Sequence, residues 1–354
     1  MASTFYHSFA DGLRGWTLDN AQAEPASWLG RQALMLRSGF VLAPVEMAPP
    51  YALKAKVSSG PGECYVGFCF HLADAENYET IYVAPQAGDR PTGVQYDPVI
   101  NGSNTWQIFG DADGLAAGPL RPPLRSEHWH TLALEVWADI AQVHMDDDPS
   151  PKAVFPLRSG LCRGGVGLWG YLPSYVADFE VRALSVPPPP MPEPKVAVLT
   201  GTVREWLVAQ YDERLQAFVG ARRAKSEHNG TLCLNRLYRT SPAARAIVAC
   251  DVDVPQHAGR AVVELGYSDR GRVWWDDALV HEGEWRWDPP RSDGRIRPGQ
   301  VTVPVPTTPG SHRLRAEIAA AEPPFGWGVT ARVVADGVPC EWQPASTLQV
   351  PIGV

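Results

Sequence analysis

Aromatic, amide and acidic side chains gather between Tyr78 and Gln107, and proteins bind sugars with this mixture of side chains. The apolar face of a pyranose stacks on Tyr or Trp, and its hydroxyl groups pair with amides and carboxylates. The sequence therefore predicts a groove for a saccharide or another small polar molecule. The residues predicted to bind this ligand are Tyr65, Gln95, Tyr96, Asp97, Asn101, Trp106 and Gln107.

Successive side chains on a strand point to opposite faces of the sheet, so their positions in the sequence predict which face each side chain lies on. In the run 78–83, Ile81 and Val83 are expected in the core, and the opposite face carries Tyr78, Thr80 and Tyr82. By the same alternation, the residues expected in the core from the preceding run are Cys64, Val66, Phe68 and Phe70. The residues expected on the ligand face of that run are Tyr65, Gly67, Cys69 and His71, with Gly67 leaving room for the ligand.

A second interpretation of the same groove is catalytic. His71 with Tyr78 or Tyr82 forms a pair that can exchange protons at a substrate carbon, as a lyase, an epimerase or an isomerase requires. Glu79 is a further acidic candidate on the same run. Tyr and Trp faces also stabilise cations, which suits a small-molecule cyclase. Against these stands a structural role, in which His71 is a hydrogen-bonded core residue and the aromatics cover a sandwich edge.

The sequence predicts neither a metal site nor a cofactor. Asp111-Ala112-Asp113-Gly114 lacks the further ligands of a calcium loop, and Asp146-Asp147-Asp148 is typical of a hairpin turn. The cysteines form no CxxC pair, so we expect buried free thiols. They are Cys64, Cys69, Cys162, Cys233, Cys250 and Cys340.

Short apolar alternations between turn signals predict an all-β chain of two antiparallel β-sandwich, jelly-roll domains. The strands expected in the first half are 33–42, 51–57, 63–71, 78–84, 106–109, 129–136, 141–145, 166–169 and 176–184. Those expected in the second half are 246–254, 261–267, 272–275, 278–282, 300–305, 312–319 and 329–334. Ser268-Asp269-Arg270-Gly271 and Asp276-Asp277 are expected as tight turns.

The run SVPPPPMPEPK separates the two halves, because consecutive prolines favour an extended spacer. It predicts a first domain over residues 1–185, a linker over 186–195 and a second domain over 196–354.

The first half resembles the concanavalin A-like lectin and glucanase superfamily, particularly its laminin-G-like bacterial members. The resemblance is carried by FADGLRGW, CYVGFCFHLADAENYETIYVAP, HTLALEVWADIAQVHMDD and GGVGLWGYLPSYVADFEVRAL, taken in order. It implies a jelly roll with a concave face that often binds sugars, although the superfamily also contains hydrolases, lyases and adhesion modules. The glucanases of this superfamily carry an E-x-D-x-x-E strand. This sequence has only a lone Glu135 at the nearest strand, so a glucan hydrolase of that type is not expected.

The second half resembles galactose-binding-like sandwich modules, through ELGYSDRGRVWWDDALVHEG and PPFGWGVTARV. Such modules brace or target a neighbouring domain. In the cluster of Trp274, Trp275, Trp285 and Trp287, alternation places Val273 and Trp275 on one face and Arg272 and Trp274 on the other.

Charge and hydropathy exclude some partners. The formal net charge of -8 and the absence of a Lys/Arg block argue against binding to nucleic acid. No apolar run approaches the length of a membrane span, and the N-terminus lacks the pattern of a signal peptide, so a cytoplasmic, non-membrane protein is expected. Neither the ligand nor the oligomeric state follows from the sequence.

Three hypotheses remain. The first is a carbohydrate-binding or carbohydrate-processing protein with its ligand on the concave face of the first domain. The second is an enzyme of another kind in the same groove, using a His, Tyr or carboxylate proton relay. The third is a structural interaction module.

Overall fold

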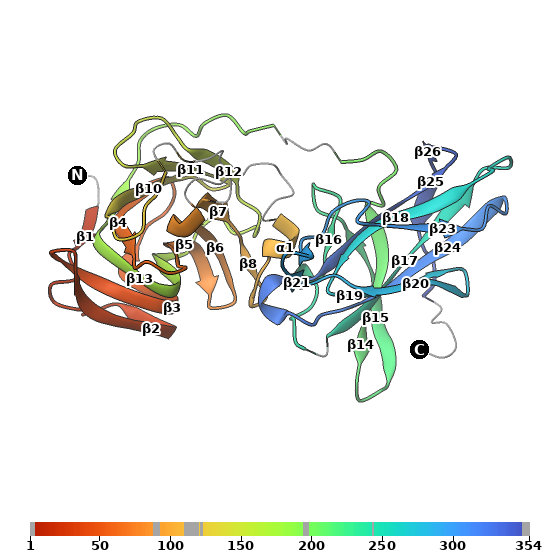
Figure 1. Ribbon diagram of the computed structural model, residues 1–354, viewed down its shortest axis with the longest axis horizontal. Coiled ribbons are helices and arrows are strands. Elements are labelled where there is room, and N and C mark those ends of the chain that lie inside the picture. Colours follow the sequence, from red (N-terminus) through yellow and green to blue (C-terminus); the bar gives the residue numbers. More distant parts are fainter. Residues whose placement is uncertain are drawn as a thin grey trace. The chain divides into compact units, whose positions relative to one another are not determined.

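The computed structural model describes residues 4–87, 93–109, 120, 123–193, 198–242 and 244–348 (Figure 1). Strands dominate these residues, which confirms the all-β prediction. Within them, no helix has the length and apolarity to cross a membrane. The chain divides into two compact units, Met1–Ile100 with Gly114–Pro194, and Asn101–Asp113 with Lys195–Val354. The second unit is therefore not contiguous in the sequence, and the domain bounds expected from the linker do not include its first segment.

The first unit is built almost entirely of antiparallel strands. They are β1 (Thr4–His7), β2 (Thr17–Trp28), β3 (Arg31–Glu46), β4 (Tyr51–Ser59), β5 (Tyr65–Asp74), β6 (Asn77–Val83), β7 (Val94–Tyr96), β8 (Val99–Ile100), β10 (His130–Val136), β11 (Ile140–Met145), β12 (Ala153–Pro156) and β13 (Gly165–Ala183), with the 3-10 turn η1 at Pro85–Ala87.

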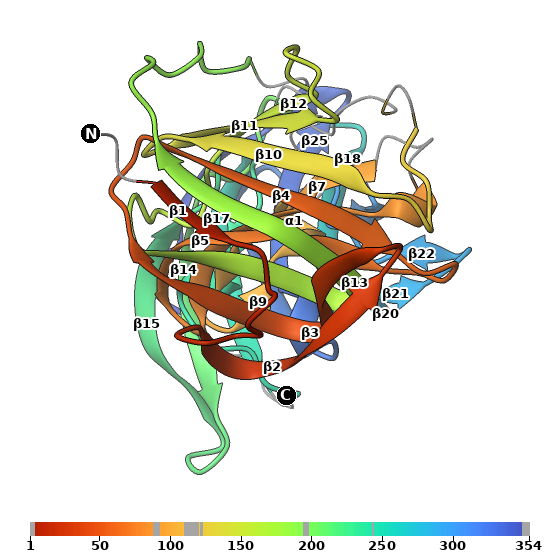
Figure 2. The same cartoon turned by 90° about the vertical axis from the view of Figure 1, so that its left-hand side faces the viewer.

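The strand β13 joins the two layers of this unit (Figure 2). Its first part pairs with β3 and β5, and its second part pairs with β4 and β1, while β3 continues beside it as far as Val176. A register shift between Tyr171 and Ser174 separates the two parts, as bulges do where a strand bends. The sequence predicts two strands, 166–169 and 176–184, where the structure has this single bent one.

The core of the first unit lies between its layers. Alternate residues of β5, such as Val66 and Phe68, face alternate residues of β4 and β10, such as Leu53 and Leu134. All four of these side chains are fully buried. Cys64, Val66, Phe68 and Phe70 all belong to this core, as predicted from their period of two.

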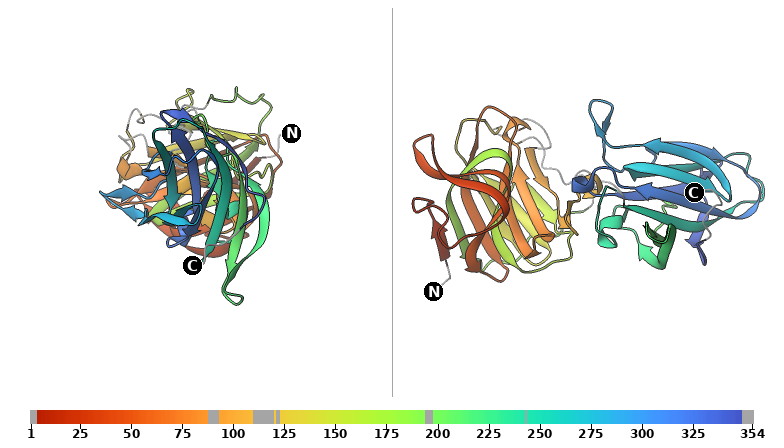
Figure 3. Two further views of the ribbon diagram at one scale, coloured as in Figure 1. Left: turned by 90° about the vertical axis from the view of Figure 1, so that its right-hand side faces the viewer. Right: turned by 90° about the horizontal axis from the view of Figure 1, so that it is seen from below.

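The second unit is also a sandwich, of two antiparallel sheets (Figure 3). The larger sheet contains β14 (Glu205–Asp212), β15 (Ala217–Lys225), β17 (Arg245–Val254), β19 (Arg270–Trp275), β20 (Ala278–Glu284), β24 (Gly310–Ala319) and β27 (Glu341–Pro344). The smaller sheet contains β16 (Leu232–Cys233), β18 (Ala261–Ser268), β23 (Val301–Val305), β25 (Gly328–Ala335) and β26 (Val338–Pro339). The remaining elements are the strand pair β21 (Trp287–Asp288) and β22 (Ser292–Asp293), and the 3-10 turns η3 (Leu234–Arg236) and η4 (Pro323–Phe325).

The predicted faces of β19 are confirmed. Val273 and Trp275 lie in the core between the sheets, and Arg272 stacks on Trp274 on the outer face at 5.2 Å. Asp276 forms the expected turn with a positive φ. At the other predicted turn, Asp269 forms a bend between β18 and β19, but these strands belong to different sheets, so the bend is not that of a hairpin. Asp269 is fully buried, and its carboxylate accepts hydrogen bonds from the backbone N–H groups of Ala321 and Glu322.

The segment 101–109 of the second unit contains β9 (Ser103–Asn104) and the single helical turn α1 (Trp106–Phe109). The sequence predicts a strand at 106–109, and that prediction is wrong. The Asn104 side chain accepts a hydrogen bond from the Trp106 N–H at 3.0 Å, and the Thr105 carbonyl accepts from Ile108 and Phe109. These local hydrogen bonds satisfy backbone N–H groups that, in a strand, would bond to a neighbouring strand.

Five of the six free cysteines are buried, as expected, and Cys162 is exposed. Cys64, just before β5, faces the core, and Cys69 within β5 faces the opposite side, as their spacing predicts.

Candidate saccharide site on the first unit

A row of paired residues crosses the outer face of the first unit, on the side of β5 away from the core. Phe40 of β3 pairs with Trp169 of β13, and Trp169 pairs with Gly67 of β5. Gly67 pairs with Tyr82 of β6, and Tyr82 pairs with Gln95 of β7. Because side chains of paired residues project from the same face of a sheet, this register brings aromatic and amide groups together.

The glycine in the middle of this row lets two rings meet. A Cβ atom on Gly67 would lie 2.1 Å from the Ile81 carbonyl oxygen and 2.5 Å from the Tyr82 Cα atom, so no other residue fits. The Trp169 and Tyr82 rings approach over this position, with centroids 4.8 Å apart and planes inclined by 32°. The sequence predicts that Gly67 leaves room for a ligand. In the structure, that space is filled by the Trp169 and Tyr82 rings.

Two more tyrosines extend this aromatic surface. Tyr65 lies 5.8 Å from Tyr82 in an edge-to-face arrangement and 6.3 Å from Tyr171, its pairing partner on β13. Tyr171 is 54% exposed, and Tyr65 and Trp169 are half-buried. Burial, with a smaller effect of the nearby Glu63 carboxylate, raises the pKa of Tyr65 and keeps its phenol protonated. We call the set of Tyr65, Tyr82, Trp169 and Tyr171 the aromatic platform.

Polar groups border the aromatic platform along β6 and β7. The Tyr82 hydroxyl donates a hydrogen bond to the Asp97 carboxylate and lies 3.3 Å from Gln95 Oε1. Thr80 donates to the Asp97 carbonyl oxygen, and the Asp97 N–H donates to the Thr80 carbonyl at 3.1 Å. Asp97 is fully buried, so it holds the Tyr82 ring in place, whereas the amide of Gln95 is partly exposed.

Tyr78 lies on the outer face, as predicted, but it is not an open surface residue. It packs against Phe40 with centroids 5.2 Å apart, beside Cys69 and Val99. Only 7% of it is exposed. Tyr78 therefore packs within the outer face and has little surface with which to contact a ligand.

His71 lies on the opposite face from the one predicted. Its φ is 48°, and β5 changes register against β13 between Gly165 and Gly167, which places Phe70 and His71 in a bulge. The His71 ring contacts Tyr51, a core residue, with centroids 6.1 Å apart. Burial lowers the pKa of His71 to about 4, so the imidazole is neutral.

Glu79 also faces the core side, where it anchors a loop. Its carboxylate accepts hydrogen bonds from the Tyr96 hydroxyl at 2.7 Å and from the Ser159 N–H and hydroxyl at 3.0 and 2.5 Å. Tyr96 belongs to the core as well, and burial beside this carboxylate raises its pKa well above the usual value. The structure thus separates His71, Glu79 and Tyr96 from Tyr78 and Tyr82, which face the other way.

Three predicted ligand-binding residues belong to the second unit. The Asn101 amide donates to the Asn235 carbonyl at 2.5 Å, and the Trp106 ring packs against Trp287 and Phe325 with centroids 5.4 and 5.9 Å away. Gln107 Nε2 lies 3.3 Å from Asp269 Oδ1 and from Glu322 Oε2. All three join the segment 101–109 to the rest of the second unit.

The Ser268 hydroxyl completes this set of contacts, lying 2.7 Å from both Gln107 Oε1 and Asp269 Oδ1. The Gln107 carbonyl accepts from the Ile296 N–H at 2.9 Å. Burial is the main cause that raises the pKa of Glu322, and the neighbouring Asp269 adds to it. Gln107 therefore has a structural role.

Sequence analysis missed Trp169 and Tyr171, the most prominent part of the aromatic platform. The signal was present in the run GVGLWGY, where a period of two places Gly167, Trp169 and Tyr171 on one face. In the structure, Val166 and Leu168 face the core, and these three residues face outward.

Among the residues that the structure describes, no group of His, Cys, Asp and Glu side chains is arranged to hold a metal ion. Asp146 instead accepts hydrogen bonds from the Thr131 N–H at 2.8 Å and pairs with His130 at 2.7 Å, in the turn that the sequence predicts. The Asp111–Gly114 motif lies outside the described residues.

No family model matches the chain, and no curated protein matches it significantly. Solved structures that cover about half of it include the carbohydrate-binding module CBM66 from Bacillus subtilis, with 17% identity over 46% of this chain and 91% of that one, at a TM-score of 0.33. Domain 4 of AbnA, a GH43 extracellular arabinanase from Geobacillus stearothermophilus in complex with arabinotriose, has 11% identity over 51% and 93%, at 0.35. A protein of unknown function with a galectin-like fold from Bacillus subtilis has 10% identity over 51% and 98%, at 0.35.

Proposed function

We propose that the first unit binds a saccharide on its aromatic platform. The observation that supports this most strongly is that three contacting or neighbouring rings, those of Tyr65, Trp169 and Tyr171, reach solvent on one sheet face beside the buried Tyr82, with Tyr171 54% exposed. Large apolar groups in contact with one another are normally buried, so their presentation on a surface favours a binding role.

The chemistry of the aromatic platform suits a sugar ring. Tyr65, Trp169 and Tyr171 offer ring faces and edges to the C–H groups of a pyranose or furanose. The Gln95 amide lies at the border, where ring hydroxyls would project. Tyr82 is also held rigid, because it is only 5% exposed, its hydroxyl is bound by Asp97, and its ring packs against Tyr65 and Trp169. A rigid site loses little conformational entropy when it binds.

Affinity electrophoresis and calorimetry test this proposal. The intact protein is run through gels that contain arabinan, levan, laminarin or xyloglucan, and the polymer that retards it is then titrated as oligosaccharides. Tyr171→Ala and Trp169→Ala are each expected to weaken binding by about tenfold or more, because aromatic anchors carry most of the energy of such sites.

Tyr6→Ala is the matched control, since Tyr6 is 57% exposed on β1 of the same unit and lies outside the aromatic platform. It is expected to bind like the unsubstituted protein. Retention by none of the polymers, or equal loss in Tyr6→Ala and Tyr171→Ala, would contradict the proposal and favour a structural module. A proton relay between His71 and Tyr78 or Tyr82 has no support in the geometry, because His71 faces the core and the two tyrosines face outward.

A further inference from the structure

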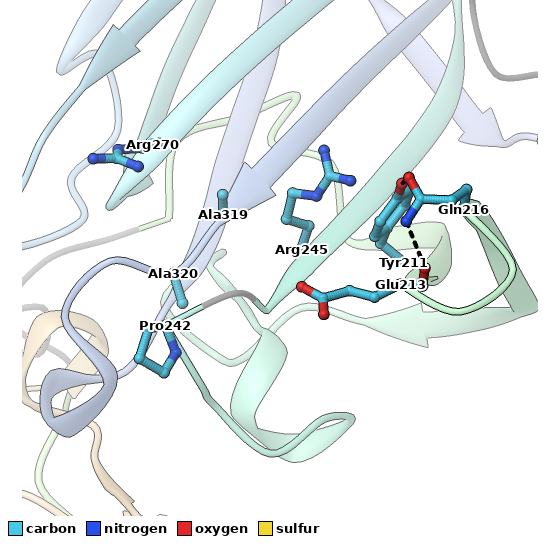
Figure 4. Close-up of a pocket in the computed structure, with 8 residues that line it drawn as sticks. All are labelled: Tyr211, Glu213, Gln216, Pro242, Arg245, Arg270, Ala319 and Ala320. Carbon is cyan, nitrogen blue, oxygen red and sulfur yellow. Dashed lines mark hydrogen bonds between the residues drawn. The ribbon is translucent and has the colours of Figure 1, made fainter.

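The second unit carries a surface pocket of about 410 Å³ at one end of its larger sheet (Figure 4). Its apolar lining is small and consists of Pro242, Ala319 and the almost fully buried Ala320, which we call its base. Polar side chains form its walls: Tyr211, Glu213, Gln216, Arg245 and Arg270. We call it the arginine pocket.

Strand register places one arginine on each side of this base. Ala319 of β24 pairs with Arg245 of β17 and with Arg270 of β19. Since directly paired residues lie about 4.5–5.5 Å apart, the two arginine Cα atoms are roughly 9–11 Å apart. The two arginines therefore flank the single methyl group of Ala319, and Figure 4 shows them on either side of it.

Each guanidinium is held by one carboxylate and keeps other donors for a ligand. Arg245 lies flat on the Tyr211 ring at 3.6 Å and donates through Nη1 to Glu317 at 3.2 Å. Arg270 donates through Nε to Glu284 at 2.6 Å. The N–H groups at Nε and Nη2 of Arg245 and at both Nη atoms of Arg270 are not used in these pairs.

The third wall is a turn with a fixed shape. Tyr211 donates to Gln216 Oε1 at 2.9 Å, and the Gln216 amide donates to the Glu213 carbonyl. The Asp212 carboxylate accepts from the N–H groups of Arg214 and Leu215 at 2.9 and 3.0 Å. The Glu213 side chain is exposed and projects toward the pocket in Figure 4, where it offers two acceptor oxygens.

The charged side chains in and around the arginine pocket indicate which class of ligand it suits. The guanidinium groups of Arg245 and Arg270, with that of Arg286, which shares Glu284 at 3.6 Å, are matched by the carboxyl groups of Glu213, Glu284 and Glu317, so the pocket has no positive excess to attract an anion. Fixed donors on two walls and acceptors on a third suit vicinal hydroxyl groups, which both accept and donate. The alanine and proline base suits the C–H face of a sugar ring.

We propose that the arginine pocket is a second saccharide site, selective for neutral, hydroxyl-rich ligands. It is independent of the aromatic platform, since every residue that lines it belongs to the second unit. Two sites on one chain would give a polysaccharide two points of attachment, and linked sites bind a polymer more tightly than either does alone.

The test uses the intact protein with both aromatic platform residues removed, Trp169→Ala/Tyr171→Ala, and the same four neutral polymers. This variant is expected to keep weakened binding to at least one polymer. Adding Arg270→Ala or Glu213→Gln is expected to reduce that remaining affinity by roughly tenfold or more, the value of a lost hydrogen bond to a charged group. Adding Arg291→Ala is the control, because its side chain is 81% exposed and lies outside the pocket.

Circular dichroism of each variant confirms that the fold is kept. Remaining binding that Arg270→Ala and Glu213→Gln leave unchanged would overturn this proposal, as would the absence of any remaining binding. Retention by polygalacturonate in place of the neutral polymers would overturn the ligand class. Binding that is lost with Arg270→Ala but unaffected by Trp169→Ala/Tyr171→Ala would support the arginine pocket and contradict the aromatic platform. Binding of no polymer by the unsubstituted protein would contradict both.

Discussion

Gly67→Ala is the sharpest perturbation of the aromatic platform. The added Cβ atom would lie 2.1 Å from the Ile81 carbonyl oxygen and 2.5 Å from Tyr82 Cα, far inside van der Waals contact. Both contacts are with the backbone of β6, which cannot rotate away as a flexible side chain would. We expect β5 and β6 to separate locally and the Tyr82 ring to move off Trp169.

The magnitude follows from the type of clash. Inserting a methyl group into a packed site costs about 1–3 kcal/mol, and the rigid neighbours place this substitution near the upper end. Loss of chain entropy in the unfolded state offsets about 0.4–1 kcal/mol of that. The net loss of about 2–2.6 kcal/mol corresponds to a fall in melting temperature of roughly 4–10 °C for a unit of this size.

Scanning calorimetry measures the stability change, and near-ultraviolet circular dichroism reports the packing of the Trp169–Tyr82 pair. Gly60→Ala is the matched control, because a Cβ atom there meets nothing within 4 Å. It is expected to leave the melting temperature unchanged or slightly raised. If Gly67→Ala melts within about a degree of Gly60→Ala, with an unchanged near-ultraviolet spectrum, the steric reasoning is wrong.

Two further predictions concern buried polar groups. The pKa of His71 is about 4 in the folded chain and 6.5 when unfolded, so the unfolded state takes up the proton first as the pH falls. We expect up to about 3 kcal/mol of stability to be lost between pH 6.5 and 4. His71→Phe should lose less over that range in urea titrations, and equal losses would contradict the assignment. Gln107→Ala should destabilise the second unit by about 1–3 kcal/mol, because Ser268, Asp269 and Glu322 lose a buried partner. An unchanged melting profile in calorimetry would show that Gln107 is dispensable.

The sequence predicts much of the strand arrangement, because period-two patterns survive wherever a strand is regular. Tyr78, Thr80 and Tyr82 fall on the expected face, and Ile81 and Val83 fall in the core. The same logic fails at His71, since the bulge that turns it inward is set by the register of β13, more than ninety residues away. The residue pattern of one strand does not determine its register with the strand that it pairs with.

The position of the segment 101–109 was not predictable for a related reason. Local composition places Asn101, Trp106 and Gln107 beside Tyr82 and Gln95, which are close in the sequence. Their actual partners, such as Asn235 and Glu322, follow after more than a hundred residues. Long-range pairings of this kind are decided by the tertiary packing of the whole second unit, which no local pattern encodes.

The discontinuity of the second unit has a consequence for the order of events during synthesis. Gln107 leaves the ribosome long before Asp269 and Glu322 exist, a delay of roughly 10–40 seconds at ordinary elongation rates. For that period, Trp106 and Gln107 have none of the later-made partners that hold them in the finished protein. The second sandwich therefore depends on a segment translated before the rest of its chain, and a gene fragment that begins at the proline-rich linker would encode a sandwich that lacks it.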